Sequence, residues 1–263
     1  MTDPAATLAQ LLFLVEAGAD ETIGEEPVDR FAAPPAAAAA RTAPAAPAPV
    51  RPPEPESAGE TDAIGSAQAL AAAAGSLDEL KKAVENFDGC PLKRGASHTV
   101  FAGGNPASRV MLIGEAPGRE EDRAGVPFVG RAGKLLDKML AAIGRDRDGV
   151  YITNVVAWRP PENREPTPEE VAACLPFLRR HIELVDPALI VLLGAVAVKN
   201  VMGLTDGIMR LRGRWLEYRL GSRMVPVLPT LHPAYLLRQP AQKKLAWHDL
   251  MEIAARLEEP EAA

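Results

Sequence analysis

Four acidic residues follow the first strongly apolar segment of the globular part of the sequence. The apolar run Val110–Ile113 stops at Gly114, and the acids lie in the glycine- and proline-containing stretch 115–122 that comes next. A buried parallel strand typically ends in this way. Open α/β sheets bind ligands at the carboxyl ends of their strands, so the pattern predicts a ligand site lined by carboxylates. A tight turn with solvated acids would give the same pattern, and neither interpretation names a substrate.

A second feature predicts an anion-binding site beside these acids. Residues 134–143 carry apolar side chains at helical spacing, which places Gly130–Gly133 at the N-terminus of a helix. Backbone N–H groups in the first turn of a helix have no partner within it, and such ends hold phosphate groups. The sequence therefore predicts a strand, a loop and a helix around one pocket.

The segments that must position this pocket begin near residue 76. Strand candidates alternate with helical segments, which predicts an α/β fold of three layers around a short parallel sheet. The strand candidates are 99–102, 110–113, 150–155, 188–193 and 225–228, and the helical candidates are 77–87, 133–143, 168–184, 195–202 and 240–257.

The first 75 residues differ from the rest in composition. Residues 1–30 form an acidic segment in which Leu8–Ala17 is a short amphipathic helix candidate, either docked on its own domain or bound to a partner protein. Residues 31–75 are rich in alanine and proline, so we expect a disordered linker that buries no core. The globular domain is then expected over residues 76–258.

Charge is distributed unevenly between these parts. The net charge of the chain is −6, but residues 1–75 contain 11 acidic and 3 basic residues, leaving 24 acidic and 26 basic residues in the remainder. A weakly basic domain is compatible with nucleic-acid binding. The N-terminal segment lacks a basic region of the kind that precedes a secretory signal, and the longest apolar run, 189–198, is too short to span a bilayer. We therefore expect a cytoplasmic protein that has no membrane partner.

Four segments at predicted strand ends are more specific together than any one alone. They are 114–122 (GEAPGREED), 151–164 (YITNVVAWRPPENR), 193–197 (LGAVA) and 231–238 (LHPAYLLR). In this order they resemble the uracil-DNA glycosylase superfamily, specifically its family 4, over about residues 85–257. The resemblance implies an α/β/α sandwich around a short, mostly parallel four-stranded sheet. It also implies an enzyme that flips uracil out of DNA and hydrolyses its N-glycosidic bond, leaving an abasic site.

The resemblance further implies catalytic roles for individual residues. Ala116 stands where some families of the superfamily place an aspartate, so Glu115 or Glu121 would position the attacking water. Gly118 belongs to the same substrate-binding loop. His232 would donate a hydrogen bond to uracil O2 as negative charge builds on the leaving base, and a neutral imidazole suffices for this.

Other residues are implied to bind the base and the duplex. Phe128 would stack on the flipped base. Asn154 would read uracil, because its amide offers one donor and one acceptor to O4 and N3–H. Asn163 would help to hold the pocket. The loop expected to enter the duplex consists of Tyr235, Leu236, Leu237 and Arg238.

The cysteine count departs from the resembled family, whose members usually carry an iron-sulfur cluster held by four cysteines. This sequence has two, Cys90 and Cys174, both at ligand positions of the family, while Phe87 and Trp158 occupy the other two positions. Because a cubane cluster needs four ligands, we expect no cluster and no other metal or cofactor, with the aromatic rings filling the volume. The two cysteines are then either buried free thiols or a disulfide.

Three functions remain open at this point. The leading one is a monofunctional glycosylase that acts as a monomer on uracil-containing DNA. A poorly turning-over or non-catalytic protein that binds uracil or abasic sites on the same fold is the alternative. The third is an unrelated α/β nucleotide-binding hydrolase, which the segment around His232 disfavours. No protein partner of the N-terminal tail can be named from the sequence.

Overall fold

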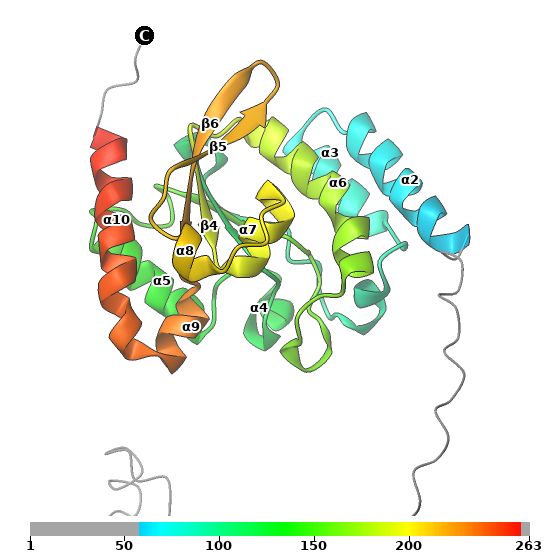
Figure 1. Ribbon diagram of the computed structural model, residues 1–263. Helices are drawn as coiled ribbons and strands as arrows, with labels where there is room; N and C mark the ends of the chain where they lie inside the picture. The colour runs from blue at the N-terminus through cyan, green and yellow to red at the C-terminus, as the bar shows by residue number, and fades with distance from the viewer. Residues whose placement is uncertain (1–57, 259–263) are drawn as a thin grey trace, which may run out of the picture. The chain divides into compact units, whose positions relative to one another are not determined.

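The computed structural model describes residues 58–258 of the chain (Figure 1). The chain divides into the units Met1–Pro53 and Glu54–Ala263, and the described residues belong to the second. The predicted acidic segment, with its helix candidate Leu8–Ala17, lies outside the described residues. Over the part that is described, no helix combines the length and the apolar character needed to cross a membrane.

A six-stranded sheet in the order β1-β3-β2-β4-β6-β5 forms the centre of the domain. Its strands are β1 Gly103–Gly104, β2 Val110–Gly114, β3 Tyr151–Asn154, β4 Leu189–Leu193, β5 Leu216–Leu220 and β6 Arg223–Thr230. The four inner strands pair in parallel, and the two edge strands are antiparallel to their neighbours. The predicted mostly parallel α/β fold is therefore confirmed, with two edge strands added. Residues 99–102 are not a strand, and β5 was not predicted.

Helices cover both faces of the sheet, which gives the three predicted layers (Figure 1). Alternate residues of β2 show the division: Val110 and Leu112 pack in a core with α5 and α10, while Met111 and Ile113 pack in a core with α2, α3, α6 and α7. The helices are α2 Ala58–Ala73, α3 Leu77–Asn86, α4 Arg119–Ala124, α5 Arg131–Ala141, α6 Pro168–Val185, α7 Ala195–Met202, α8 Ile208–Leu211, α9 Pro233–Arg238 and α10 Lys243–Glu258.

Helix α2 lies within the stretch 31–75 that composition predicted to be a disordered linker. Its buried residues Ala67 and Ala71 belong to the core that α3 and α6 share. The Arg180 side chain of α6 donates two hydrogen bonds, of 2.9 and 2.8 Å, to the Ala74 carbonyl just beyond the end of α2. Alanine loses no side-chain entropy in a helix, so an alanine-rich segment forms one readily when a neighbouring surface accepts it. The expected linker therefore differs from the structure over α2, and residues 31–57 lie outside the described residues.

The parallel strands bring the four sequence motifs to one edge of the sheet. Gly114 at the end of β2 pairs with Asn154 at the end of β3, and Leu193 at the end of β4 pairs with Thr230 at the end of β6. The loops that follow these four strands therefore begin side by side. This is the edge at which open α/β sheets bind their ligands.

Candidate active site

An open cavity lies at this edge. It brings together nine of the residues singled out in the sequence: Glu115, Ala116, Gly118, Glu121, Phe128, Asn154, Asn163, His232 and Arg238. Sequence reasoning did not assign Pro117, Ala132, Pro160, Arg164 and Ala234 to the pocket, and they also line it. The order of the motifs along the chain was a sufficient signal for the position of the pocket, but it did not identify these five further residues.

Asn154 and Phe128 converge on Gly114 at the floor of the cavity. A Cβ atom on Gly114 would lie 2.5 Å from Asn154 Oδ1 and 2.7 Å from Phe128 Cζ, so only glycine allows both side chains to approach the strand end. Asn154 is 6% exposed and Phe128 is 5% exposed. Asn154 Oδ1 is the one buried side-chain polar atom of the described residues that has no hydrogen-bond partner. An orphaned buried acceptor of this kind is unfavourable unless a ligand satisfies it.

His232 caps the N-terminus of α9 and faces the same floor. Its ring centroid lies 5.6 Å from that of Phe128. The Ala234 backbone N–H donates to His232 Nδ1 at 3.1 Å. Burial, with a smaller contribution from the charge of Arg238, lowers the pKa of His232 to about 4. The imidazole is therefore neutral at physiological pH, and because Nδ1 accepts a hydrogen bond, the ring proton is on Nε2.

The segment after β4 allows His232 to sit this close to the sheet. Gly194 has a φ of 93°, in the left-handed region that glycine tolerates. A Cβ atom there would lie 3.0 Å from His232 Cβ. The motif that begins at Leu193 thus contributes to the site through its backbone, because it makes room for the histidine of another motif.

The two candidate carboxylates have different surroundings. Burial raises the pKa of Glu115, the charge of Glu165 raises it further, and Arg238 partly opposes the shift. Glu121 instead accepts hydrogen bonds from two backbone N–H groups, Gly118 N–H at 3.1 Å and Gly130 N–H at 2.9 Å. One carboxylate therefore faces the cavity in a poorly solvated position, and the other links the N-termini of α4 and α5.

The position of Glu121 also corrects the anion site predicted at the start of α5. The Gly130 N–H group was expected to be free for a phosphate, but it is bound to this carboxylate. A second anion at the same place would be repelled at short range. The first turn of α5 is therefore part of the framework of the pocket and does not present the predicted phosphate site.

Comparison with known proteins assigns the family. Residues 101–251 match the family model described as the uracil DNA glycosylase superfamily. The chain belongs to this superfamily. It is 45% identical over 163 residues to the type-4 uracil-DNA glycosylase of Thermotoga maritima. The aligned region covers 62% of this chain and 83% of that protein. It is 41% identical over 182 residues to the type-4 uracil-DNA glycosylase of Archaeoglobus fulgidus, covering 68% and 92%. The resemblance to family 4 is thus confirmed.

The segment that the superfamily resemblance predicted to enter the duplex forms the short helix α9. Leu236 is 1% exposed and packs in the core beside α5 and α10. Insertion into DNA would require this side chain to leave that core, and it stays a prediction. Tyr235 and Leu237 are half-buried, and Arg238 is exposed at the rim of the cavity.

A turn with unusual backbone geometry also borders the cavity. Glu162 and Asn163 both have a φ of 55°, so two successive residues adopt the left-handed conformation. Arg159 Nε donates to Asn163 Oδ1 at 2.7 Å and thereby holds the turn. Asn163 is exposed at the cavity. This places it at the entrance to the glycosylase pocket, away from the buried floor.

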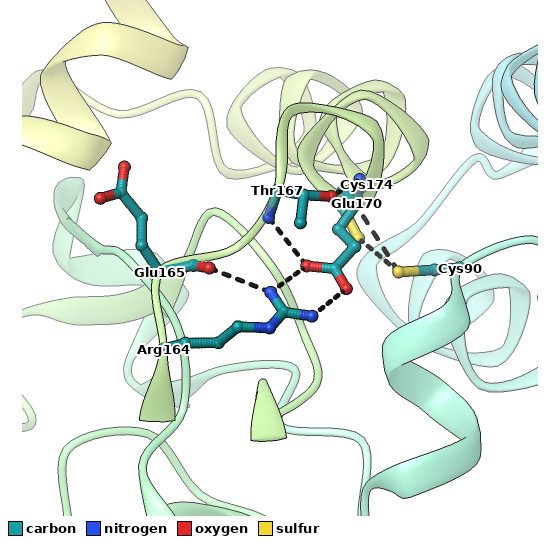
Figure 2. Close-up of polar contacts among 6 residues, drawn as sticks. All are labelled: Cys90, Arg164, Glu165, Thr167, Glu170 and Cys174. Carbon is teal, nitrogen blue, oxygen red and sulfur yellow. Dashed lines mark hydrogen bonds and ion pairs between the residues drawn. The ribbon is translucent and has the colours of Figure 1, made fainter. Parts of the chain in front are cut away.

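Arg164 connects this rim to the two cysteines (Figure 2). Its guanidinium donates to both carboxylate oxygens of Glu170 at 2.8 and 2.6 Å, which holds the pKa of that carboxyl below its usual range. The same carboxylate accepts the Thr167 N–H group at 2.8 Å at the start of α6. The Glu170 backbone carbonyl lies 3.9 Å from Cys90 Sγ, which accepts a 3.8 Å contact from the Cys174 thiol.

The residues around the thiols do not fit the cluster of the usual family member. Both cysteines are free and buried. Phe87 packs edge-on against Phe177 at a centroid distance of 5.1 Å, and Trp158 Nε1 donates to Thr99 Oγ1 at 3.1 Å. The two further ligand positions thus hold packed aromatic rings, which offer no ligand to iron. Within residues 58–258, no group of three or more His, Cys, Asp or Glu side chains is placed to hold a metal ion.

Proposed function

We propose that this chain is a DNA-repair glycosylase that flips uracil out of DNA and hydrolyses its N-glycosidic bond, leaving an abasic site. The observation that carries the proposal is the convergence of Asn154, Phe128 and His232 on one cavity at the carboxyl edge of the sheet. Membership of the uracil-DNA glycosylase superfamily supports the same reaction. The base must leave the duplex, because the bond cannot be reached within the stack.

Recognition of uracil rests on Asn154 and Phe128. The unpartnered Oδ1 of Asn154 would accept the N3–H of uracil, and the amide nitrogen would donate to O4. Cytosine presents the reversed pattern at these positions and would leave both groups of the amide unsatisfied. The ring of Phe128 supplies a stacking surface, and such stacking is worth about 1–3 kcal/mol per base.

Departure of the base rests on His232. As the bond between uracil N1 and deoxyribose C1′ breaks, its electron pair moves onto the base and negative charge builds on O2. The proton on Nε2 of the neutral imidazole is available to donate a hydrogen bond to that oxygen. A fixed donor directed at developing charge stabilises the transition state without a change in its own protonation.

Attack by water rests on Glu115. Its carboxylate lines the cavity and is poorly solvated, while the oxygens of Glu121 are bound to backbone N–H groups. We assign Glu115 to orient the water, accept its proton and oppose the positive charge that develops at C1′. Glu121 is assigned to hold the loop in place.

The enzyme is proposed to work without an iron-sulfur cluster. Two thiols are half of the ligand set that a cubane requires, and the rings of Phe87 and Trp158 fill the other positions. Iron and acid-labile sulfide analysis of the purified protein tests this independently of activity. We expect both to be far below stoichiometric, and four irons per chain with a broad absorption near 400 nm would contradict the proposal.

The catalytic unit is proposed to be a cytoplasmic monomer formed by residues 58–258. Helix α2 belongs to it, because Ala67, Ala71 and Ala74 are buried in the common core. A truncated chain that begins at Ala58 is therefore expected to fold and to excise uracil like the full chain. One that begins at Ser76 is expected to be destabilised, because the surface of α6 that α2 covers becomes exposed.

The experiment that tests the proposal uses a uracil-containing oligonucleotide and alkaline cleavage of the abasic product. Several strand scissions per enzyme molecule are expected, with none on the matched thymine oligonucleotide. Asn154→Asp should lower uracil excision and favour cytosine, because a carboxylate accepts from the cytosine amino group. An unchanged ratio of uracil to cytosine excision in this variant would show that Asn154 does not read the base. A single turnover followed by retention of abasic DNA would instead support a damage-binding protein.

A further inference from the structure

The backbone of Phe128 has a conformation that its side chain does not favour. Its φ is 54°, and an aromatic residue in the left-handed region persists only where its surroundings enforce it. The ring is nevertheless buried beneath the cavity, against Gly114 and beside His232. The orientation of the ring therefore depends on whatever holds the peptide group that follows it.

Arg147 makes the contacts that hold this peptide group. Its Nη2 donates to the Phe128 carbonyl, and its Nη1 donates to the Pro127 carbonyl at 3.2 Å. Its Nε donates to Asp137 Oδ1 at 2.8 Å, which fixes the guanidinium against α5. One planar cation thus binds two successive carbonyls and a carboxylate, a geometry that guanidinium can satisfy and ammonium cannot.

Two glycines complete the arrangement. A Cβ atom on Gly133 would lie 1.7 Å from the Phe128 carbonyl oxygen, so α5 packs directly against this carbonyl. On the other side, a Cβ atom on Gly104 would lie 2.7 Å from the Arg147 carbonyl oxygen, and Gly104 has a φ of 84°. Strand β1 thereby packs closely against the loop that carries Arg147. The arginine is thus supported from both α5 and the sheet.

Resting on the proposed function, we propose that Arg147 is a positioning residue for uracil excision, because it holds Phe128 in the orientation that stacks on the flipped base. Arg147 does not line the cavity, and its side chain is 31% exposed. It acts through the Phe128 carbonyl. Without the Arg147 side chain, the φ of Phe128 is free to relax to a negative value, which turns the phenyl ring away from Gly114 and Asn154.

A matched control for this arrangement exists elsewhere in the same domain. Arg223 donates to Asp186 through Nε at 3.1 Å and through Nη2, and to the Pro187 carbonyl at 2.9 Å. Asp186 also has a positive φ, 49°. This second arginine lies at the amino ends of β4 and β6, at the opposite edge of the sheet from the cavity. Removal of the Arg223 side chain should lower the stability of the fold in the same way but leave base stacking unchanged.

The test compares single-turnover excision and thermal unfolding for Arg147→Ala, Arg223→Ala, Phe128→Ala and the double variant Arg147→Ala/Phe128→Ala. We expect Arg147→Ala to slow excision by about ten- to a hundredfold, a range typical of misplaced catalytic geometry. The double variant should be no slower than Phe128→Ala alone, because the arginine acts only through that ring. Arg223→Ala should lower Tm but excise uracil within about twofold of wild type. Arg147→Lys should give an intermediate rate, since an ammonium group can bind only some of the two carbonyls and the carboxylate that the guanidinium holds.

The outcomes separate this inference from the proposed function. Equal excision by Arg147→Ala and Arg223→Ala, or additive losses in the double variant, would overturn the positioning role while leaving the glycosylase intact. An inactive wild-type protein would instead remove the proposed function on which the inference rests. If Arg147→Ala does not fold, the comparison of Arg147→Lys with Arg223→Lys decides the question: a slower rate in Arg147→Lys alone supports the role, and equal rates overturn it.

Discussion

The proposed uracil pocket and the region around the two cysteines lie in one domain, but they differ in how their buried groups are satisfied. In the pocket, Asn154 Oδ1 has no partner and burial raises the pKa of Glu115. Around the cysteines, by contrast, Glu170 is fully paired with Arg164, and Trp158 has found a partner for its indole N–H. The pocket keeps groups available for a ligand, and the other region is closed by packing.

This difference has an energetic reason. A buried acceptor without a partner costs about 1–3 kcal/mol, which is tolerable where a bound base supplies the missing donor. A vacant metal site offers no such compensation, because buried thiols and an empty volume would remain. The rings of Phe87 and Trp158 are 2% and 1% exposed and occupy part of that volume, while a small cavity lined by Trp158, Cys174 and Phe177 remains. One domain therefore combines a cavity with an unpartnered buried acceptor and a pair of buried thiols flanked by aromatic rings.

The largest effect that tests this comparison is expected at Glu115. Glu115→Gln keeps the shape of the side chain but cannot accept the proton of water, so excision should slow by about 10²–10⁴-fold. Stability should not fall, because burial already disfavours the charged form. The matched variant Glu121→Gln should mainly lower Tm, since it weakens the link between Gly118 and Gly130. If Glu121→Gln slowed the chemical step more than Glu115→Gln, the two assignments would have to be exchanged.

The next effect concerns stability on the cysteine side. Trp158→Ala removes a fully buried indole and should lower the free energy of unfolding by about 3–5 kcal/mol. The remaining folded protein should excise uracil with nearly the wild-type rate constant under stabilising conditions. Trp247→Ala, at a side chain that is 44% exposed, should change stability by about 0.5 kcal/mol or less. Similar losses of stability for the two tryptophan variants in denaturant titrations would show that the Trp158 indole is not part of the core.

The pH dependence of excision should report the pocket alone. Glu115 must be ionised to accept a proton. Burial raises its pKa above the ordinary value of 4.5. As the pH is lowered, the rate should therefore begin to fall at a higher pH than it would if the base were an exposed glutamate. His232 has a pKa of about 4 and should remain neutral through that descent. Glu115→Gln should therefore lose the acidic limb of the pH–rate profile. An acidic limb that persists in this variant would assign the titration to another group.

The smallest effect is expected for the thiols themselves. Cys90→Ala/Cys174→Ala removes two buried sulfur atoms that do not line the candidate active-site cavity. The excision rate should stay within about twofold of wild type, with a loss of stability of about 1–2 kcal/mol. A strong loss of activity with an unchanged Tm would show that the thiols take part in excision, contrary to this account.

The position of the pocket could be predicted from sequence because parallel strands end at a common edge. Gly114, Asn154 and Thr230 each end an inner strand, so the motifs that begin there had to meet. The pairing of Phe128 with His232 followed from the family resemblance. What a motif cannot specify is the rotation of a short helix: Leu236, which is expected to contact DNA, is buried in the core of the structure.

Other differences arose from tertiary contacts that leave no local pattern. Nothing in the sequence around Glu121 indicates that its carboxylate reaches Gly130 nine residues later. The alanines of α2 have no amphipathic pattern, and they are ordered because α6 covers them. Strand β5 is short and half exposed, and it exists because it pairs with β6. In each case a partner distant in sequence decided the local structure.

The central claim is that this domain carries a working uracil pocket beside a cluster site that has been closed by packing. The most direct test measures multiple-turnover excision on a uracil oligonucleotide by protein whose iron content has been determined in the same preparation. Many turnovers by protein with far less than one iron per chain, unchanged after treatment with a chelator, is the predicted result. Activity that rises in proportion to bound iron, or is absent from the iron-free fraction, would contradict the claim.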